Sequence, residues 1–208
     1  MKRLLVIGNG PSLAEIPNEF LASYHSFGGN RIYLKFVPDV YFYVDPIGAE
    51  TWDWAKDIMA LKSIKYIDRV SAPLFPGCTP LNCIHKLGFS YSPLNYIFTY
   101  FSVLTPMLQM ALYYGYDEVG LIGVDHDYKI EGEYRADQVS DGESDTNHFS
   151  ADYHTPGTIW KAPRLDLLEK WFSLARNIFD AAGRRIVNLT PGSKLDTFER
   201  EDWHTWQK

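Results

Sequence analysis

The chain opens with Leu4-Leu5-Val6-Ile7-Gly8-Asn9-Gly10-Pro11-Ser12-Leu13, a short apolar run followed by a glycine-rich turn. Such a run predicts a buried strand that leads into a tight loop. Gly8 and Gly10 let the backbone turn sharply and approach a ligand. Ser12 is placed to cap a following helix, whose free N–H groups attract a phosphate. The pattern indicates a nucleotide phosphate loop, with a plain strand-to-helix turn as the alternative.

Two better-known phosphate loops do not fit this stretch. A Walker loop requires Gly-Lys-Ser/Thr, which does not follow, and the dinucleotide pattern requires a third glycine. A G-x-G pair alone leaves nucleotide binding and an ordinary turn about equally favoured.

The length and net charge of the chain limit the number of domains and the kinds of partner that can be expected. The 208 residues predict one domain, 1–208, with a substantial core. A net charge of −6 argues against nucleic acid as the main partner. Cys78 and Cys83 lack the spacing of a zinc site, so we expect free thiols in a reducing cytoplasm. Assembly into a homo-oligomer is left open.

The sequence predicts neither a signal peptide nor a membrane span. The apolar run after Met1 is too short for a signal peptide. No charged residue occurs between Lys86 and Asp117, but polar residues and prolines interrupt this stretch before it reaches eighteen apolar residues. The sequence therefore predicts a buried helix here, no membrane span, and a cytoplasmic protein.

Short apolar runs alternate with helical patterns along the chain. Strands are predicted at 4–7, 40–44, 64–67, 119–124 and 185–189, with a further short strand ending near Asn30. One helix is expected from an N-cap at Thr105-Pro106 to Gly115, and another over 163–182, ended by Gly183. This alternation predicts an α/β fold with a mainly parallel sheet.

A long polar segment interrupts this alternation. Residues 125–153 carry many acids and turn formers, with aromatic and histidine residues among them. A loop of this length in a compact domain is usually a lid or an insertion. The aromatic residues favour a lid over about 127–153, which we expect to order over a bound ligand, rather than a plain surface loop.

Polar residues follow the predicted strands, where ligands of parallel sheets bind. The candidates for ligand contacts are Gly8, Asn9, Gly10, Ser12, Asn30, Asp45, Asn188, Thr190, Ser193 and Lys194. Lys194 would neutralise phosphate as a mobile charge, or else lie exposed on a turn.

Acid–base and metal chemistry would come from the end of the fourth predicted strand and from the loop. Asp125 and Asp127 can hold magnesium on a phosphate, or Asp125 can simply cap a turn. His148 and His154 are candidate general bases or acids, with a structural role as the alternative for each.

Several blocks of the chain together resemble a large family of bacterial, archaeal and phage proteins. It includes the MptE-like 6-hydroxymethyl-7,8-dihydropterin pyrophosphokinases and relatives of the motility accessory factors. The blocks are Gly8–Leu13, Asn30–Leu34, Val44-Asp45-Pro46, Leu121–His126, Asn147-His148-Phe149 with Asp152-Tyr153, and Asn188–Leu195. They run in order over nearly the whole chain. This resemblance implies ATP and Mg²⁺, with Asp45, Asp125 or Asp127 on the metal.

A more distant resemblance is to the small bacterial CMP-sialic-acid-dependent sialyltransferases. They share the Gly-Asn-Gly-Pro-Ser-Leu opening, an asparagine at the place of Asn30, and a run like Gly115–Glu118. The resemblance implies a Rossmann-like fold, a cytidine nucleotide donor, a lid, and a catalytic histidine that best matches His154. The sialyltransferases have asparagine where Asp45 stands, and their Arg-Ile-Thr-Ser-Gly block has no counterpart here.

Three functions follow from these patterns. We favour a cytoplasmic glycosyltransferase of surface glycan synthesis, which uses a nucleotide sugar of the CMP type and a glycan or small-molecule acceptor. Asn9, Asn30 and Ser12 would hold the nucleotide, and His148 or His154 would deprotonate the acceptor. The alternatives are an MptE-like pyrophosphokinase and a non-catalytic nucleotide- or sugar-binding module, because fold does not fix function.

Overall fold

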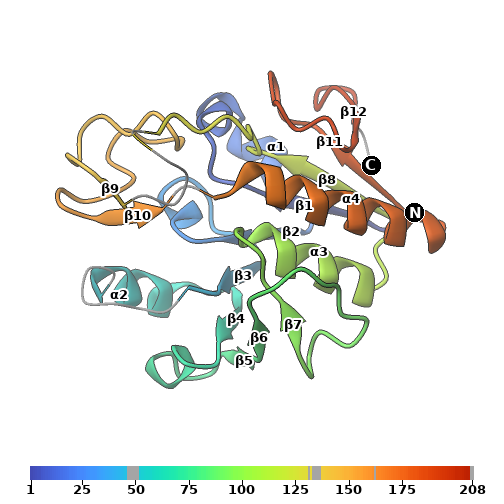
Figure 1. Ribbon diagram of the computed structural model, residues 1–208, viewed down its shortest axis with the longest axis horizontal. Helices are drawn as coiled ribbons and strands as arrows, with labels where there is room; N and C mark the ends of the chain where they lie inside the picture. Colours follow the sequence, from blue (N-terminus) through green and yellow to red (C-terminus); the bar gives the residue numbers. More distant parts are fainter. Residues whose placement is uncertain (46–51, 131, 133–136, 162, 207–208) are drawn as a thin grey trace.

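A single sheet of eight strands organises the computed structural model, which describes residues 1–45, 52–130, 132, 137–161 and 163–206 (Figure 1). Every strand pair in it is parallel, in the spatial order β12-β11-β8-β1-β2-β3-β4-β5. The strands are β1 (Arg3–Ile7), β2 (Ser26–Gly29), β3 (Val40–Tyr43), β4 (Ile64–Asp68), β5 (Thr79–Leu81), β8 (Glu118–Ile122), β11 (Arg185–Asn188) and β12 (Glu199–Arg200).

This arrangement confirms the predicted α/β, Rossmann-like fold. The five apolar runs form β1, β3, β4, β8 and β11, and the expected short strand before Asn30 is β2. The sequence analysis missed the edge strands β5 and β12. They are only three and two residues long and largely exposed, so they carry no apolar pattern.

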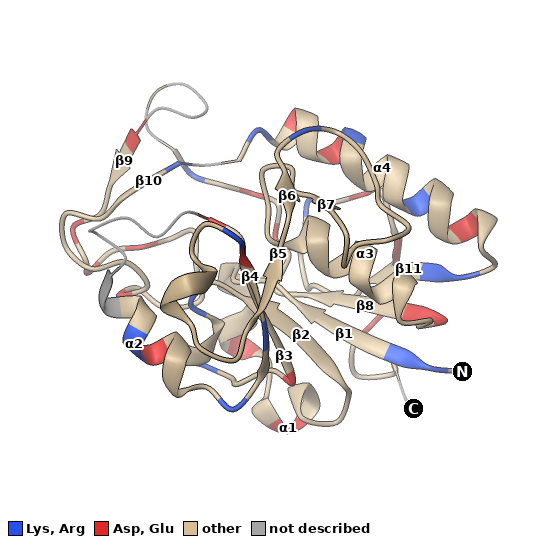
Figure 2. Ribbon diagram, turned by 90° about the horizontal axis from the view of Figure 1, so that it is seen from below, with Lys and Arg blue, Asp and Glu red and all other residues tan. Residues whose placement is uncertain are grey.

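Each face of the sheet has its own hydrophobic core, because successive strand side chains point to opposite faces. Leu4 and Val6 face the core under α3 (Leu104–Tyr113) and α4 (Leu165–Ala181). Leu5 and Ile7 face the core shared with α1 (Asn18–Leu21) and α2 (Trp52–Ala60). Helices therefore cover both faces, and Figures 1 and 2 show α3 and α4 together on one side of the sheet.

The two predicted long helices are present, with one corrected start. α4 lies within its expected range of 163–182 and begins two residues later, and Gly183 follows it with φ +68°. α3 begins at Leu104, so Thr105 lies inside the helix and is not its N-cap. Thr105 is fully buried, and its hydroxyl donates to the Ser102 carbonyl and accepts from the Tyr100 N–H. The Ser102 hydroxyl accepts the Leu104 N–H instead.

Smaller elements complete the described chain. Short 3-10 turns occur at Pro11–Glu15, Ile32–Leu34 and Ala72–Leu74, and β6 (Cys83–Ile84) pairs in parallel with β7 (Ile97–Phe98). Cys78 and Cys83 are free thiols, as predicted. Figure 2 shows basic and acidic residues mixed along α4. Among the described residues, no helix combines the length and apolarity needed to cross a bilayer.

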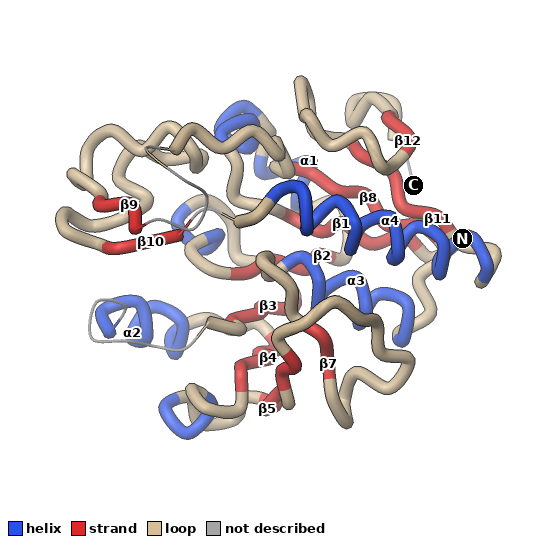
Figure 3. Tube along the Cα trace, in the orientation of Figure 1, coloured by secondary structure: helices blue, strands red, loops and turns tan. Residues whose placement is uncertain are grey.

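The segment between β8 and α4 is mostly loop, as the tube in Figure 3 shows. It contains an unpredicted antiparallel pair, β9 (Asp137–Val139) and β10 (Ile159–Lys161). Positions 131 and 133–136 of the predicted lid lie outside the described residues. The pair lies beyond the carboxyl ends of the sheet strands, far from the N-terminus (Figure 1).

The strand order reverses between β1 and β8. From β1 the chain proceeds through β2, β3, β4 and β5 to one side, and β8, β11 and β12 lie on the other. Loops that leave two adjacent strands in opposite directions open a crevice at their carboxyl ends. Such a reversal places the loops after Ile7 and Ile122 at the expected ligand site.

Candidate functional site

A cavity of about 620 Å³ lies at this reversal point. Its walls come from the loops after β1, β2, β3 and β8, from α2 and α3, and from the β9–β10 region. Among the residues predicted from sequence, those that line it are Gly8, Asn9, Gly10, Asn30, Asp45, Asp125, Asp127, His148 and His154.

The glycine-rich loop packs on the loop after β8. A β-carbon on Gly8 would lie 2.3 Å from the Gly123 carbonyl oxygen, and the Gly10 N–H donates to that same oxygen at 2.8 Å. Residues with side chains do not tolerate such an approach. These glycines therefore allow the two loops to pack closely, in addition to lining the cavity.

Ser12 does not cap a helix, contrary to the prediction. It lies within the 3-10 turn Pro11–Glu15, whose cap residue, Gly10, has no side chain to offer. The Ser12 N–H and hydroxyl instead donate to the two carboxylate oxygens of Asp125, at 3.0 and 2.8 Å. Ser12 thus joins the first loop to the loop after β8, and it does not line the cavity.

The loop after β11 is also built on internal bonds. Asn188 donates to Ser193 Oγ and the Leu195 carbonyl, and Ser193 donates to the Val124 carbonyl. The Thr190 hydroxyl accepts the Val124 N–H. These three side chains are buried outside the cavity lining, so their polar groups shape the turn after β8 rather than face a ligand. Lys194 is exposed and also lies outside the lining.

Two asparagines that line the cavity have side-chain oxygens without a hydrogen-bond partner. Asn9 donates through Nδ2 to the Gly29 carbonyl, whereas its buried Oδ1 has no partner. Asn30 Oδ1 is likewise buried without a partner. Asn30 adopts φ +55°, a conformation that asparagine tolerates better than most residues. Buried acceptors without donors are rare, and these two oxygens have almost no exposed surface, so a ligand donor would reach either one only after its side chain turns toward the cavity.

Asp125 and Asp127 differ in their surroundings. Burial raises the pKa of Asp125, although the hydrogen bonds from Ser12 oppose this rise. Asp127 is exposed, and the hydrogen bond from Lys129 lowers its pKa. Both line the cavity, but both Asp125 oxygens already accept hydrogen bonds from Ser12. A magnesium ion here would use the second lone pair of an Asp125 oxygen, beside those bonds.

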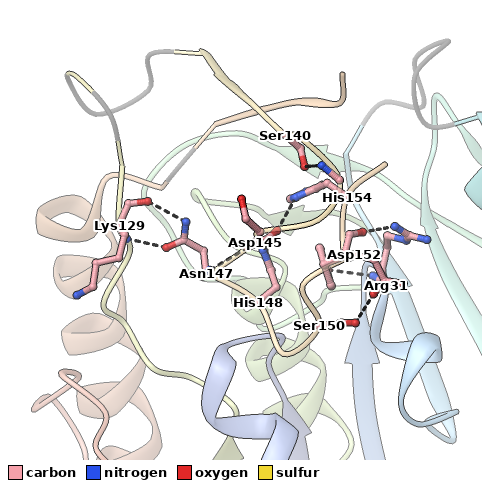
Figure 4. Close-up of polar contacts among 12 residues, drawn as sticks. Arg31, Lys129, Ser140, Asp145, Asn147, His148, Ser150, Asp152 and His154 are labelled. Carbon is pink, nitrogen blue, oxygen red and sulfur yellow. Dashed lines mark hydrogen bonds and ion pairs between the residues drawn. The ribbon is translucent and has the colours of Figure 1, made fainter. Parts of the chain in front are cut away.

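The two loop histidines converge on one carboxylate, as Figure 4 shows. His148 Nδ1 and His154 Nδ1 each lie 2.8 Å from Oδ2 of Asp145. Oδ1 of the same carboxylate accepts the Asn147 N–H at 2.8 Å. The side chains of Asp145 and His154 are 4% and 6% exposed, so water contributes little to these bonds.

Protonation within this cluster is set by burial and by the shared carboxylate. Burial would raise the pKa of Asp145, but the hydrogen bonds from His148 and His154 lower it well below its usual range. Burial lowers the pKa of His148 against the pull of Asp145. Asp145 is therefore ionised and His148 neutral at neutral pH.

Aromatic rings fix the orientation of both imidazoles. Tyr153 stacks on His148 with centroids 3.9 Å apart and planes at 4°. Trp160 stacks on His154 with centroids 5.6 Å apart and planes at 9°. The indole of Trp54 also lies near His154, with the two ring centroids 6.2 Å apart. A histidine held in this way keeps one tautomer and one direction.

The lid segment is attached to the first half of the chain at two places. The Phe149 N–H donates to the Asn9 carbonyl at 3.0 Å. The buried Arg31 guanidinium donates to the Tyr153 carbonyl, and the Tyr153 hydroxyl accepts the Arg31 N–H at 3.2 Å. Within the lid, Asn147 pairs with the Lys129 backbone through both amide atoms (Figure 4). Ligand-dependent ordering of the lid stays a prediction.

His126 follows Asp125 in a strained conformation. It has φ +56°, lines the cavity, and lies 3.2 Å from the Glu169 carboxylate of α4. Burial lowers its pKa, and the Glu169 hydrogen bond opposes this effect. A non-glycine residue at positive φ often marks a functional site.

Sequence reasoning missed Asp145 and the aromatic wall. Asp145 precedes His148 by three residues, a spacing that could have identified it as a partner. Trp54 and Trp160 reach the cavity from segments more than a hundred residues apart, so no local pattern could join them.

Comparisons with known proteins give one structural likeness. The MAf glycosyltransferase from Magnetospirillum magneticum AMB-1 matches with a TM-score of 0.57 and 12% sequence identity. The match covers 99% of this chain and 34% of that protein's chain, so this chain spans about a third of its length. No family model matches the sequence, and no curated protein matches it. At this identity the likeness shows the fold alone.

Proposed function

We propose that this chain is a nucleotide-dependent glycosyltransferase. One observation carries the proposal: a cavity at the sheet reversal has unpartnered Asn9 and Asn30 oxygens together with a histidine pair held by Asp145. The first feature suits a ligand with donor groups, and the second suits removal of a proton. The glycosyltransferase whose fold is similar supports the same class.

The histidine pair provides a general base for the acceptor. When Nδ1 of an imidazole donates to Asp145, the lone pair is on Nε2. That nitrogen takes the proton of the acceptor hydroxyl while the acceptor oxygen attacks the sugar carbon. The bond from sugar carbon to phosphate oxygen breaks, and the nucleotide leaves with its electron pair. Asp145 stabilises the imidazolium that forms.

Charge around the cavity bears on the donor. Lys161 is the only lysine or arginine among the described lining residues, and it pairs with Asp137 at 3.0 Å. Asp45, Asp125 and Asp127 line the same cavity. Without a metal, a donor with a single phosphate charge therefore fits better than a triphosphate. We propose a CMP-type nucleotide sugar, a glycan or small-molecule acceptor, and a cytoplasmic role in surface glycan synthesis.

The three acids favour a second candidate. A Mg²⁺ ion on Asp45, Asp125 or Asp127 could neutralise ATP for an MptE-like pyrophosphoryl transfer. Both Asp125 oxygens accept a hydrogen bond from Ser12, and each keeps a lone pair that could bind the ion.

A ligand screen separates the two candidates. CMP, CDP, UDP, GDP and ATP are tested by thermal shift, each with Mg²⁺ and with a chelator, because a ligand of the native state raises its melting temperature. A metal-independent shift with CMP supports the glycosyltransferase, and a shift with ATP that needs Mg²⁺ supports the pyrophosphokinase. The absence of any shift at millimolar concentration would contradict both.

A further inference from the structure

We propose that Asp145, His148 and His154 form a binding site for a divalent transition metal ion of the zinc class. This inference goes beyond the proposed transferase function and does not require a nucleotide. It concerns different residues from Asp125 and Asp127, the acids that a magnesium ion would use.

The three side chains already converge on one point. Their candidate ligand atoms all lie within 4.8 Å of one another. The Oδ2 atom of Asp145 is 2.8 Å from Nδ1 of each histidine. In tetrahedral geometry, zinc bonds of about 2.0–2.2 Å to nitrogen and carboxylate oxygen place neighbouring ligand atoms roughly 3.3–3.6 Å apart. Each Nδ1 atom therefore has to move roughly 0.5–0.8 Å away from Oδ2 for the ion to fit between them.

The surroundings hold the ligands in place. The Asn147 N–H fixes the other carboxylate oxygen, and the rings of Tyr153 and Trp160 stack on the two imidazoles. Such outer contacts orient the ligands of metal sites and raise their affinity. Because the cluster is mostly buried, little rearrangement of flexible side chains accompanies binding.

The donor set selects the class of ion. Two imidazole nitrogens and one carboxylate suit zinc and its first-row neighbours, whereas calcium and magnesium prefer oxygen ligands. The ligands must bind in deprotonated form.

Three protein ligands leave a coordination position for another group. Sites that hold zinc only for structure usually have four protein ligands, whereas sites with three bind water or substrate at the open position. Both histidines line the cavity, so the open position would be accessible from it.

Metal and proton compete for the same nitrogens. In the metal-free cluster both Nδ1 atoms carry protons toward Asp145, and Nε2 is free. An ion on Nδ1 moves each ring proton to Nε2, which removes the base of the proposed transfer. If the transferase proposal holds, zinc should therefore inhibit transfer, and a chelator should restore it.

Cobalt provides the direct test, because its visible absorption reports a protein site with imidazole ligands. The chain is stripped with a chelator and titrated with Co²⁺, and Zn²⁺ stoichiometry is measured by equilibrium dialysis. We expect about one ion per chain and a loss of affinity of roughly tenfold or more in Asp145→Asn, His148→Gln and His154→Gln. The matched control is His204→Gln, since His204 is exposed and pairs with Asp202 outside the cavity.

Two results would overturn the site: no bound ion at micromolar Co²⁺ or Zn²⁺, or unchanged affinity in the three variants. Where a variant fails to fold, ¹⁵N spectra of the wild-type histidines decide instead. Zinc should move the ring proton from Nδ1 to Nε2 in two histidines. If the spectra show no such movement, the proposal is refuted. Nucleotide binding, measured on the metal-free chain, reports separately on the transferase function.

Discussion

A β-carbon on Gly10 would lie 1.9 Å from Oδ2 of Asp125. The space beside Gly10 is therefore filled by a carboxylate of the protein, where the sequence suggested room for a phosphate. Ser12 holds that carboxylate through its N–H and hydroxyl, at 3.0 and 2.8 Å. Because Gly10 has no side chain, the loops after β1 and β8 can pack closely together where the strand order reverses.

This relationship predicts that Gly10→Ala destabilises the fold. Gly10 has φ −70° and ψ 164°, which alanine adopts freely, so any loss reflects the clash with Asp125. We expect a loss of about 1–3 kcal/mol in urea unfolding. In the Asp125→Ala background the same substitution should cost at least about 0.5 kcal/mol less. Equal costs in both backgrounds would refute the contact.

Asn30→Gly should separate stability from nucleotide binding. Glycine adopts the φ of +55° readily, and the substitution removes a buried oxygen that has no partner. Stability without ligand should change by less than about 1 kcal/mol. The affinity for the nucleotide found in the screen should fall up to about tenfold, the worth of one hydrogen bond. Asn95→Gly, at an exposed site outside the cavity, is the control, and equal affinities in the two variants would contradict the role of Asn30.

His148→Gln with His154→Gln should abolish transfer while nucleotide binding persists. Glutamine can still donate to Asp145 but cannot accept the acceptor proton at neutral pH. We expect kcat to fall by about 10²–10⁴, the usual contribution of a general base. Nucleotide binding measured by calorimetry checks that the cavity is intact. Full turnover in the double variant would exclude these residues as the base.

His126 predicts a pH dependence of stability. Burial lowers its pKa in the fold, so the unfolded chain binds more protons below the ordinary histidine pKa of about 6.5. Its contribution to stability is complete above about pH 6.5 and is lost as the pH falls toward the folded pKa. His126→Asn keeps a residue suited to φ +56° and removes the titration.

Urea unfolding at pH 7.5 and 5.5 measures this effect. The wild type should lose more stability between the two values than His126→Asn does. His204→Asn, at an exposed histidine, should behave as the wild type. The same loss in the wild type and His126→Asn would show that this residue does not titrate on unfolding.

Arg31→Met should loosen the lid without unfolding the sheet. The buried guanidinium donates to the Tyr153 carbonyl, and methionine retains bulk but not the donors. Hydrogen exchange should become faster over 147–154 and remain unchanged in β1 and β8. Arg69→Met is the control, because Arg69 bonds Asn82 on an exposed surface away from the cavity. Unchanged exchange in the lid would mean that other contacts hold it.

Several elements could be read from the sequence because their determinants are local. Alternate apolar residues in β1 are buried on both faces, and a helical apolar stripe ending at Gly183 gives α4. The start of α3 was misplaced because Thr105-Pro106 looks like a cap, whereas burial and the Ser102 hydroxyl decide the first turn. The pair β9–β10 was missed because its strands are three residues long and largely exposed.

The sequence by itself determined the fold class and the position of the loops that follow the strands, since apolar periodicity and glycine turns act over a few residues. Only the tertiary structure decided which polar side chains face the cavity. Asn188 ends a strand, and Thr190 and Ser193 follow it as Asn9 follows β1. These three residues form bonds within and between the turns, whereas Asn9 retains an oxygen without a partner. Asp145 joins two histidines for the same reason: hydrogen-bond partners depend on three-dimensional packing of distant segments, which no local pattern encodes.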